Sequence, residues 1–228
     1  MYEAVFISDV HIGSSKRVAD FLTFLEQVES KKIFLLGDII DVVNSSADRE
    51  IERFFEILSK KEAQIYYFLG NHEKENSYFQ RFAPYFKDMT LYDSYIYRGL
   101  KYPIYLEHGD SFHQKDIFNR ALKWGLYRFK RVLFKNKSKK EQLKRKKGLY
   151  YKIKPLIRNA LYNSYVKYIV SQAKKNRCNV AICGHLHHLE KKELEGIVYI
   201  NCGDWLKALS YVVENSAGEL ELKRYIRE

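Results

Sequence analysis

The chain has 228 residues, a formal net charge of +12 and a hydrophobic fraction of 46%. This composition excludes a disordered chain, and the length suits one domain that carries an insertion. The three cysteines, Cys178, Cys183 and Cys202, lack the Cys-x-x-Cys spacing, which argues against a disulfide framework and a cysteine zinc site.

The first half of the chain alternates strands with helices. Apolar runs at 4–7, 33–36 and 65–69 predict strands, and apolar residues at helical spacing predict helices over 18–28 and 51–58. Apolar strands separated by amphipathic helices are typical of βαβ units around a buried parallel sheet.

After residue 88 the pattern changes to short strands. We expect them at 89–92, 95–98, 103–107, 179–183, 189–193, 197–201, 209–214 and 219–224. The last four leave no room for helices between them, so they predict antiparallel hairpins or a meander. The expected fold class is α/β, a sandwich of two packed sheets with helices outside.

Residues 112–170 interrupt this plan, and we expect them to form a basic helical insertion within a single domain of residues 1–228. They contain eighteen Lys and Arg but only two acidic residues, a balance of +16, whereas the rest of the chain carries −4. One helix face is predicted to be apolar; its residues are Phe118, Leu122, Leu126, Phe129 and Leu133. Residues 135–147 read as a Lys-rich linker, and Pro155 predicts the start of a further helix.

Five polar clusters follow the ends of predicted strands, and six of the seven histidines lie in them. The clusters are Ser8-Asp9-Val10-His11, Gly37-Asp38-Ile39-Ile40-Asp41, Gly70-Asn71-His72-Glu73, His108-Gly109-Asp110 and Gly184-His185-Leu186-His187-His188. One such cluster alone is usually surface polarity or a turn. Five in order predict a single site, because sites in open α/β folds form at the carboxyl ends of strands.

The residue types in these clusters indicate a pair of metal ions. Imidazole and carboxylate together suit Mn, Fe or Zn better than Mg or Ca, which prefer cages made only of oxygen. Two ions at close spacing need a shared ligand, and a carboxylate can bridge them whereas a neutral imidazole cannot. We therefore expect two divalent ions, Mn²⁺ first, with Fe, Zn or Mg as alternatives.

The order D-x-H, G-D-x-x-D, G-N-H-E, H-G and G-H-x-H resembles that of the calcineurin-like metallophosphoesterases, from residue 4 to about 205. The resemblance implies an α/β/β/α sandwich of two mixed sheets and a dinuclear phosphoester or pyrophosphate hydrolase. It implies that Asp9, His11 and His187 bind one metal, that Asn71, His108 and His185 bind the other, and that Asp38 bridges them. It also implies that His72 protonates the leaving oxygen or stabilises the phosphoryl group, with Asp41 setting the tautomer of His72.

Within that superfamily the chain is most similar to the UDP-2,3-diacylglucosamine hydrolases of lipid A biosynthesis. The similarity rests on His108-Gly109-Asp110, on the length, and on the basic insertion after this motif, which in that group forms a lid over the acyl chains. It implies cleavage to 2,3-diacylglucosamine 1-phosphate and UMP. The substrate contacts that it implies are Asp110, Phe118, Leu122, Leu126 and Phe129. The best-known members carry Arg at the position of His72.

Other functions remain open at this point. The basic insertion could hold nucleic acid, as in a nuclease or a phosphoesterase of broad specificity, because Tyr127, Phe129, Tyr150 and Tyr151 could stack on bases. It could also be a solvated cationic hairpin. A scaffold that has lost catalysis would lack part of the His and Asp set, and this chain lacks none.

The expected location is the cytoplasm, at the inner face of the cytoplasmic membrane. No basic start or long apolar run marks a signal peptide, and no stretch is long enough to span a bilayer. The positive charge predicts peripheral binding to an anionic membrane surface, together with a glycolipid nucleotide substrate. The sequence indicates no protein partner.

Overall fold

The computed structural model describes residues 1–41, 47–75, 77–87, 89–112 and 140–226. The chain divides into two compact units, one made of Met1–Asp110 with Ile169–Glu228 and the other of Ser111–Tyr168. The predicted lipid contacts Phe118, Leu122, Leu126 and Phe129 lie outside the described residues.

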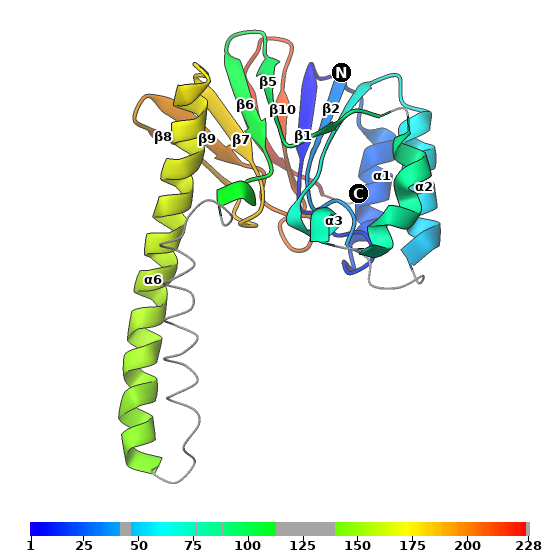
Figure 1. The fold of residues 1–228 in the computed structure, drawn as a ribbon. Coiled ribbons are helices and arrows are strands. Elements are labelled where there is room, and N and C mark those ends of the chain that lie inside the picture. Colours follow the sequence, from blue (N-terminus) through cyan, green and yellow to red (C-terminus); the bar gives the residue numbers. More distant parts are fainter. Residues whose placement is uncertain (42–46, 76, 88, 113–139, 227–228) are drawn as a thin grey trace. The chain divides into compact units, whose positions relative to one another are not determined.

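The first unit contains a six-stranded sheet in the order β11-β10-β1-β2-β3-β4. Its parallel strands are β1 (Ala4–Ile7), β2 (Lys32–Leu36), β3 (Gln64–Phe68) and β4 (Leu91–Tyr92). The antiparallel strands β10 (Ser210–Glu214) and β11 (Leu220–Arg224) extend it beyond β1. Helices α1 (Val18–Gln27) and α2 (Asp48–Ser59) lie together on the outer side of this sheet (Figure 1).

The second sheet has five strands in the order β5-β6-β7-β9-β8. They are β5 (Ser94–Arg98), β6 (Pro103–Glu107), β7 (Val180–Cys183), β8 (Glu190–Leu194) and β9 (Ile197–Asn201). Strands β6, β7 and β9 are parallel, and β5 and β8 are antiparallel to their neighbours. The expected α/β fold with two mixed sheets is therefore confirmed. The last four strands form two hairpins and not one meander, because the chain changes sheets between β9 and β10.

The space between the sheets is filled by aromatic rings. Residues Phe6, Phe34 and Tyr66 lie side by side on β1, β2 and β3, with centroid distances of 4.9 Å and 4.5 Å between neighbouring rings. The ring of Tyr97, on β5 of the other sheet, lies 4.9 Å from that of Phe34. Alternate residues such as Val5 face the helix side, so the strands are buried on both faces and read as continuous apolar runs.

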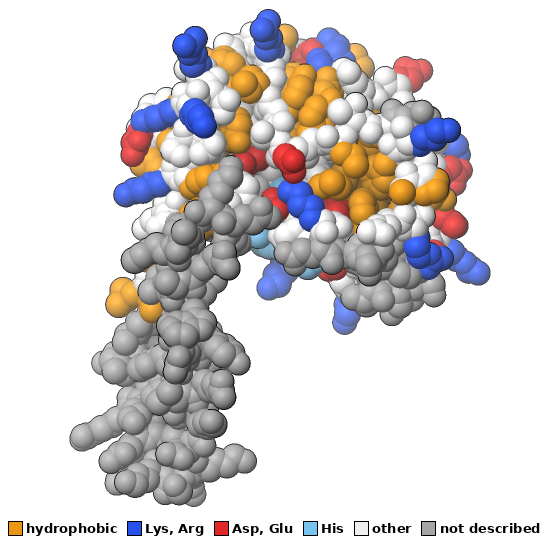
Figure 2. Space-filling model, in the orientation of Figure 1, with side chains coloured by type: hydrophobic (Ala, Val, Ile, Leu, Met, Phe, Trp, Pro, Cys, Tyr) orange, Lys and Arg blue, Asp and Glu red, His pale blue; other side chains and the backbone are white. Residues whose placement is uncertain are grey.

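Short helices and exposed strand edges complete this unit. Helix α3 (Asn71–Glu75) and the 3₁₀ segment η2 (Ser77–Phe86) connect β3 to β4. Leu91 on β4 and Ile96 on β5 are 40% and 42% exposed, and Figure 2 shows apolar side chains reaching the surface on this side of the molecule. None of the helices in the described part of the chain combines the length and the hydropathy needed to cross a bilayer.

The second unit includes most of one long helix, α6 (Lys140–Lys175). Within this unit, Ser111 and Tyr168 share a hydrogen bond of 2.9 Å between their hydroxyl groups, and the ring of Phe112 meets that of Tyr165 edge to face at 5.5 Å. The prediction that Pro155 starts a helix is wrong, since Pro155 lies inside α6. Residues 140–147 of the predicted linker are also helical. Pro155 is exposed, and its missing N–H removes one hydrogen bond from the helix interior.

We expect Phe34→Ala to lower the free energy of unfolding by about 3–5 kcal/mol, because it leaves a cavity between the two sheets. Urea titration would measure the change. The control is Ile96→Ala on the exposed edge, which removes little buried surface and should cost far less. Equal losses in the two variants would contradict a packed core centred on Phe34.

Candidate metal centre

The structure brings together the five polar clusters at the carboxyl ends of their strands. The six-stranded sheet contributes the clusters after β1, β2 and β3, and the five-stranded sheet contributes those after β6 and β7. Three groups of side chains offer ligand atoms within 4.8 Å of one another: Asp9, His11 and His187; His11, Asp38 and His72; and Asp38, His108 and His185. Both sheets must therefore be assembled before the site exists.

The first group surrounds the carboxylate of Asp9, which is fully buried. Its Oδ2 accepts a hydrogen bond of 2.9 Å from the backbone N–H of His185, and its Oδ1 lies 3.3 Å from Nε2 of His187. The rings of His11 and His187 stack with centroids 5.2 Å apart. One oxygen of Asp9 is thus fixed by the backbone, and the other is left for the centre.

Asp38 is arranged in the same way. Its Oδ1 accepts a hydrogen bond of 2.9 Å from the backbone N–H of His72, while its Oδ2 lies 3.2 Å from Nε2 of His108 and 3.9 Å from Nε2 of His72. Burial would raise the pKa of Asp38, but the hydrogen bond and charge of His108 outweigh it and hold this pKa below its usual value. Asp38 belongs to two of the three groups, as does His11, and of these two only a carboxylate has two oxygens to offer.

The donor set fits a pair of divalent cations. Three buried atoms, Oδ1 of Asp9, Nε2 of His11 and Oδ1 of Asn71, have no hydrogen-bond partner among the described residues. Buried polar atoms are nearly always paired, so three such atoms at one place indicate a missing partner that accepts lone pairs. A mixture of imidazole nitrogen, carboxylate oxygen and amide oxygen suits Mn²⁺, Fe²⁺ or Zn²⁺.

The hydrogen bonds of the histidines assign which ring nitrogen faces the centre. Nδ1 of His108 donates to the carbonyl oxygen of Leu36 over 2.8 Å, and Nδ1 of His11 lies 3.3 Å from Oδ2 of Asp41. In both rings Nε2 is the atom directed at the centre. Burial lowers the pKa of His108, but Asp38 and Asp9 outweigh burial and raise this pKa to about 10.

His72 belongs to one of the three groups, with His11 and Asp38, and it also pairs with Asp41. Its Nδ1 lies 3.0 Å from Oδ1 of Asp41, whose other oxygen accepts a hydrogen bond of 2.9 Å from the Ser14 hydroxyl. Burial lowers the pKa of His72, but the hydrogen bond with Asp41 and the charge of Asp38 raise it above its usual value. The sequence did not predict that Asp41 also contacts His11.

Asp110, a predicted substrate contact, is buried and its Oδ2 accepts a hydrogen bond of 3.2 Å from Nζ of Lys74. Lys74 also lies 3.1 Å from Oδ1 of Asp93, which is exposed. The negative charge of Asp110 is therefore balanced by Lys74. This lysine lies about one helical turn after Asn71 on α3.

Sequence reasoning gave no role to Glu73, although it stands in the third cluster. Its side chain is 3% exposed and accepts backbone N–H groups from both sides of the site. The donors are Asp38 at 2.9 Å, Ile39 at 2.7 Å, Ile40 at 3.0 Å and Gly70 at 2.9 Å. Glu73 thus fixes the backbone on which Asp38 is carried.

Sequence reasoning also missed Asp204, which follows β9. A signal was available, because Gly203-Asp204 comes after an apolar strand just as Gly37-Asp38 does. Its Oδ2 lies 3.7 Å from Nδ1 of His187. Burial raises the pKa of Asp204, but the interaction with His187 and two backbone N–H groups outweigh burial and lower this pKa to about 2.

The backbone around the site is strained, and its glycines leave room for ligands. Five of the predicted ligand residues have positive φ angles; they are Asp9 (55°), His11 (56°), Asp38 (52°), His185 (68°) and His187 (52°). Non-glycine residues adopt this left-handed region at a cost, and it concentrates at functional sites. A Cβ atom on Gly70 would lie 2.1 Å from Oδ1 of Asp38, and one on Gly184 would lie 2.5 Å from Oδ2 of Asp9.

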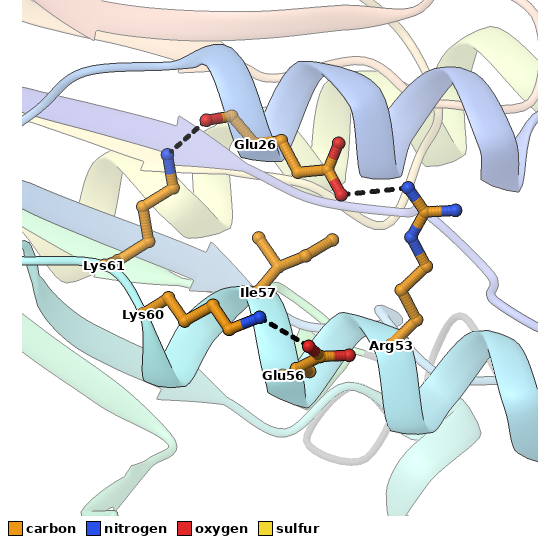
Figure 3. A pocket seen from close by; sticks show the side chains of 6 residues that line it. All are labelled: Glu26, Arg53, Glu56, Ile57, Lys60 and Lys61. Atoms are coloured by element: carbon orange, nitrogen blue, oxygen red, sulfur yellow. Dashed lines mark hydrogen bonds and ion pairs between the residues drawn. The ribbon is translucent and has the colours of Figure 1, made fainter.

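A separate hollow between α1 and α2, about 370 Å³ in volume, does not share this chemistry. As Figure 3 shows, its charges are paired with one another: Arg53 with Glu26 at 2.9 Å, and Lys60 with Glu56. Nζ of Lys61 donates to the carbonyl oxygens of Glu26 and Val28. Lys61 lies just before the start of β3 (Gln64), whereas the third polar cluster follows the end of that strand. The hollow is therefore at the opposite end of the sheet from the metal centre.

Comparison with known proteins identifies a family. The family model described as calcineurin-like phosphoesterase matches residues 3–189. No curated protein gives a significant match. A solved structure of Yfce, a phosphoesterase from E. coli, has 13% identity and a TM-score of 0.50, with 96% of this chain and 97% of that chain covered.

Two further solved structures are similar over nearly their whole length. A single mutant of Vps29 from Entamoeba histolytica has 12% identity and a TM-score of 0.48, covering 98% of this chain and 99% of that one. An archaeal phosphodiesterase has 12% identity and a TM-score of 0.48, covering 96% and 98%. At such identities, likeness to solved structures concerns the fold and not the substrate.

We expect Gly70→Ala to impair metal binding, because the added methyl group would displace the side chain and backbone of Asp38. Metal content after equilibration with Mn²⁺ should fall below that of the wild type, measured by elemental analysis. The matched control is Gly196→Ala, where a Cβ atom meets nothing within 4 Å and only the positive φ of 77° adds strain. Normal metal content in Gly70→Ala would show that the close approach to Asp38 is unimportant.

Proposed function

Because the chain belongs to the calcineurin-like phosphoesterase family and is a metal-dependent phosphoester hydrolase, we propose that its substrate is UDP-2,3-diacylglucosamine. Hydrolysis of the pyrophosphate would give 2,3-diacylglucosamine 1-phosphate and UMP. The metal centre supports hydrolysis of a phosphoester, and the basic insertion supports a lipid substrate. The insertion is therefore the observation on which the proposed substrate rests.

The residues that would hold the two ions divide into two sets around a shared carboxylate. Asp9, His11 and His187 would form one set, and Asn71, His108 and His185 would form the other, with Asp38 as the shared ligand. Two of the close groups in the structure, and the unpaired Oδ1 of Asn71, support this division. A bound pair of cations supplies positive charge for the phosphoryl oxygens and lowers the pKa of the attacking water. We expect Mn²⁺ in this role, with Fe, Zn or Mg as alternatives.

His72 is the group that would handle the proton of the leaving oxygen. Its Nδ1 faces Asp41 at 3.0 Å, so that Nε2 is the nitrogen directed at the centre, and its side chain is 40% exposed, which leaves room for a substrate. Asp41 orients the ring and favours its protonated form, as a general acid requires. Both roles are proposals that rest on this geometry.

The insertion supports a lipid more than a nucleic acid. Residues 112–170 combine a balance of +16 with an apolar stripe, and a partner recognised by charge alone needs no stripe. In the described part of α6, Leu156 is 68% exposed. The cations would then meet the anionic surface of the membrane, where the proposed lipid substrate lies.

The direct test is an assay of the Mn²⁺-loaded protein on UDP-2,3-diacylglucosamine beside single-stranded DNA. We expect release of UMP and no cleavage of DNA. The triple variant Leu122→Ser, Leu126→Ser and Phe129→Ser should lose most activity on the diacyl substrate, because each buried methylene contributes about 0.8 kcal/mol.

A small soluble phosphodiester serves as the internal control for that variant. Its hydrolysis should be unchanged, since the metal centre is carried by β1, β2, β3, β6 and β7. Leu91→Ser, an exposed apolar position on β4, is the matched surface control. Full activity of the folded triple variant on the diacyl substrate would contradict the lipid proposal. Cleavage of DNA that exceeds turnover of the lipid would replace it with a nuclease.

We expect His72→Ala to keep both metals and to lose about 10²–10⁴-fold in turnover, because a general acid is removed while the ligands remain. Elemental analysis and steady-state kinetics on the same preparation separate the two effects. His72→Arg should retain part of the activity on the glycolipid, because Arg stands at this position in similar hydrolases. Loss of one metal from His72→Ala would move His72 into the ligand set.

A further inference from the structure

The carboxylate of Asp204 connects a rigid turn to the metal centre. It is 4% exposed, and its Oδ1 accepts three backbone hydrogen bonds from the turn that follows. The donors are the N–H groups of Leu206 at 3.0 Å, Lys207 at 2.7 Å and Ala208 at 3.1 Å. This leaves Oδ2, which lies 3.7 Å from Nδ1 of His187.

The turn is itself anchored to the first strand of the site. Trp205 is fully buried among the rings of Phe21, Phe24 and Tyr211, and its backbone N–H donates to the carbonyl oxygen of Asp9 over 3.0 Å. Asp204 is therefore held at a fixed place relative to Asp9. Because its hydrogen bonds already hold this carboxylate in place, it can orient a neighbouring imidazole ring without losing further conformational freedom.

His187 is the ligand candidate that most needs such a partner. Its side chain is 33% exposed, whereas those of His11 and His108 are 5% and 1% exposed and are enclosed by the core. Packing fixes the enclosed rings, but an exposed imidazole can rotate about its Cβ–Cγ bond. Its Nε2 lies 3.3 Å from Oδ1 of Asp9, and its other ring nitrogen, Nδ1, faces Asp204.

We propose that Asp204 is a positioning residue of the metal centre, whose carboxylate holds the His187 ring so that Nε2 is the ligand nitrogen. The inference rests on the proposed metal centre and deepens it. The separation of 3.7 Å is that of an ion pair, longer than a hydrogen bond, and a small rotation of the exposed ring would close it. A carboxylate behind a ligating imidazole fixes its tautomer and raises its basicity.

The test compares Asp204→Asn with the wild type for affinity toward Mn²⁺, by titration against a metal chelator. The amide keeps an oxygen for the three N–H donors of the turn but removes the charge that faces His187. We expect the affinity for one of the two ions to fall about 10–100-fold, with the thermal midpoint close to that of the wild type. Asp204→Ala should lose stability as well, because the turn then also loses its acceptor.

The matched control is Glu214→Gln. Glu214 is 1% exposed and accepts hydrogen bonds from the Tyr97 hydroxyl at 2.6 Å and from the Leu100 N–H at 2.7 Å, so it is a buried carboxylate with no ligand contact. Both Mn²⁺ affinities should be unchanged in it. Wild-type affinities in folded Asp204→Asn would overturn the proposal.

Two further measurements separate the possible failures. If His187→Ala also keeps both affinities, the ligand set of the proposed function is wrong, whereas loss in His187→Ala alone overturns only the role of Asp204. Should Asp204→Asn fail to fold, the wild type loaded with Zn²⁺ can be examined by ¹⁵N NMR. We expect a proton on Nδ1 of His187 and the metal on Nε2; the opposite tautomer would overturn the proposal.

Discussion

The carboxylate of Glu73 lies in the interior and accepts four backbone N–H groups, three of them from the segment Asp38–Ile40 that follows β2. These donors have no strand or helix to pair with, because the chain there turns away from the sheet. A buried N–H without a partner costs about 1–3 kcal/mol, so one acceptor that serves four donors decides whether this segment keeps its shape. The position of Asp38, the predicted bridging ligand, depends on this acceptor.

The site concentrates negative charge in a place with little water. Burial raises the pKa values of Asp9 and Glu73, and the charge of Asp38 raises both further. The pKa of Asp9 is lowered in turn by the charges of His108 and His187, and that of Glu73 by the backbone N–H groups of Ile40 and Gly70 and by His108. Bound cations would balance the charge of these carboxylates, which is why the centre suits divalent ions.

Chemistry and specificity are carried by different parts of the chain. The predicted ligands follow strands of both sheets. The aromatic core between Phe6, Phe34 and Tyr97 holds these two sheets together. The excess of positive charge lies in residues 112–170, which carry a balance of +16, whereas the remainder of the chain carries −4. A fixed phosphoester centre can therefore be combined with an insertion that selects the molecule around the phosphate, and the proposed glycolipid is one such combination.

The strands, their order along the chain and the five ligand clusters could all be read from the sequence, because apolar runs and the polar residues after them are local signals. The resemblance of those clusters to a known family supplied the ligand assignments in advance. What the sequence did not supply were several contacts between distant segments: Asp41 with His11, Glu73 with the backbone after β2, and Asp204 with His187. Glu73 and Asp204 lie 34 and 17 residues from those partners, Ile39 and His187, and only the packing of the strands brings them close. At Pro155 a local rule gave a wrong prediction. Proline favours the first turn of a helix, but here α6 continues through it.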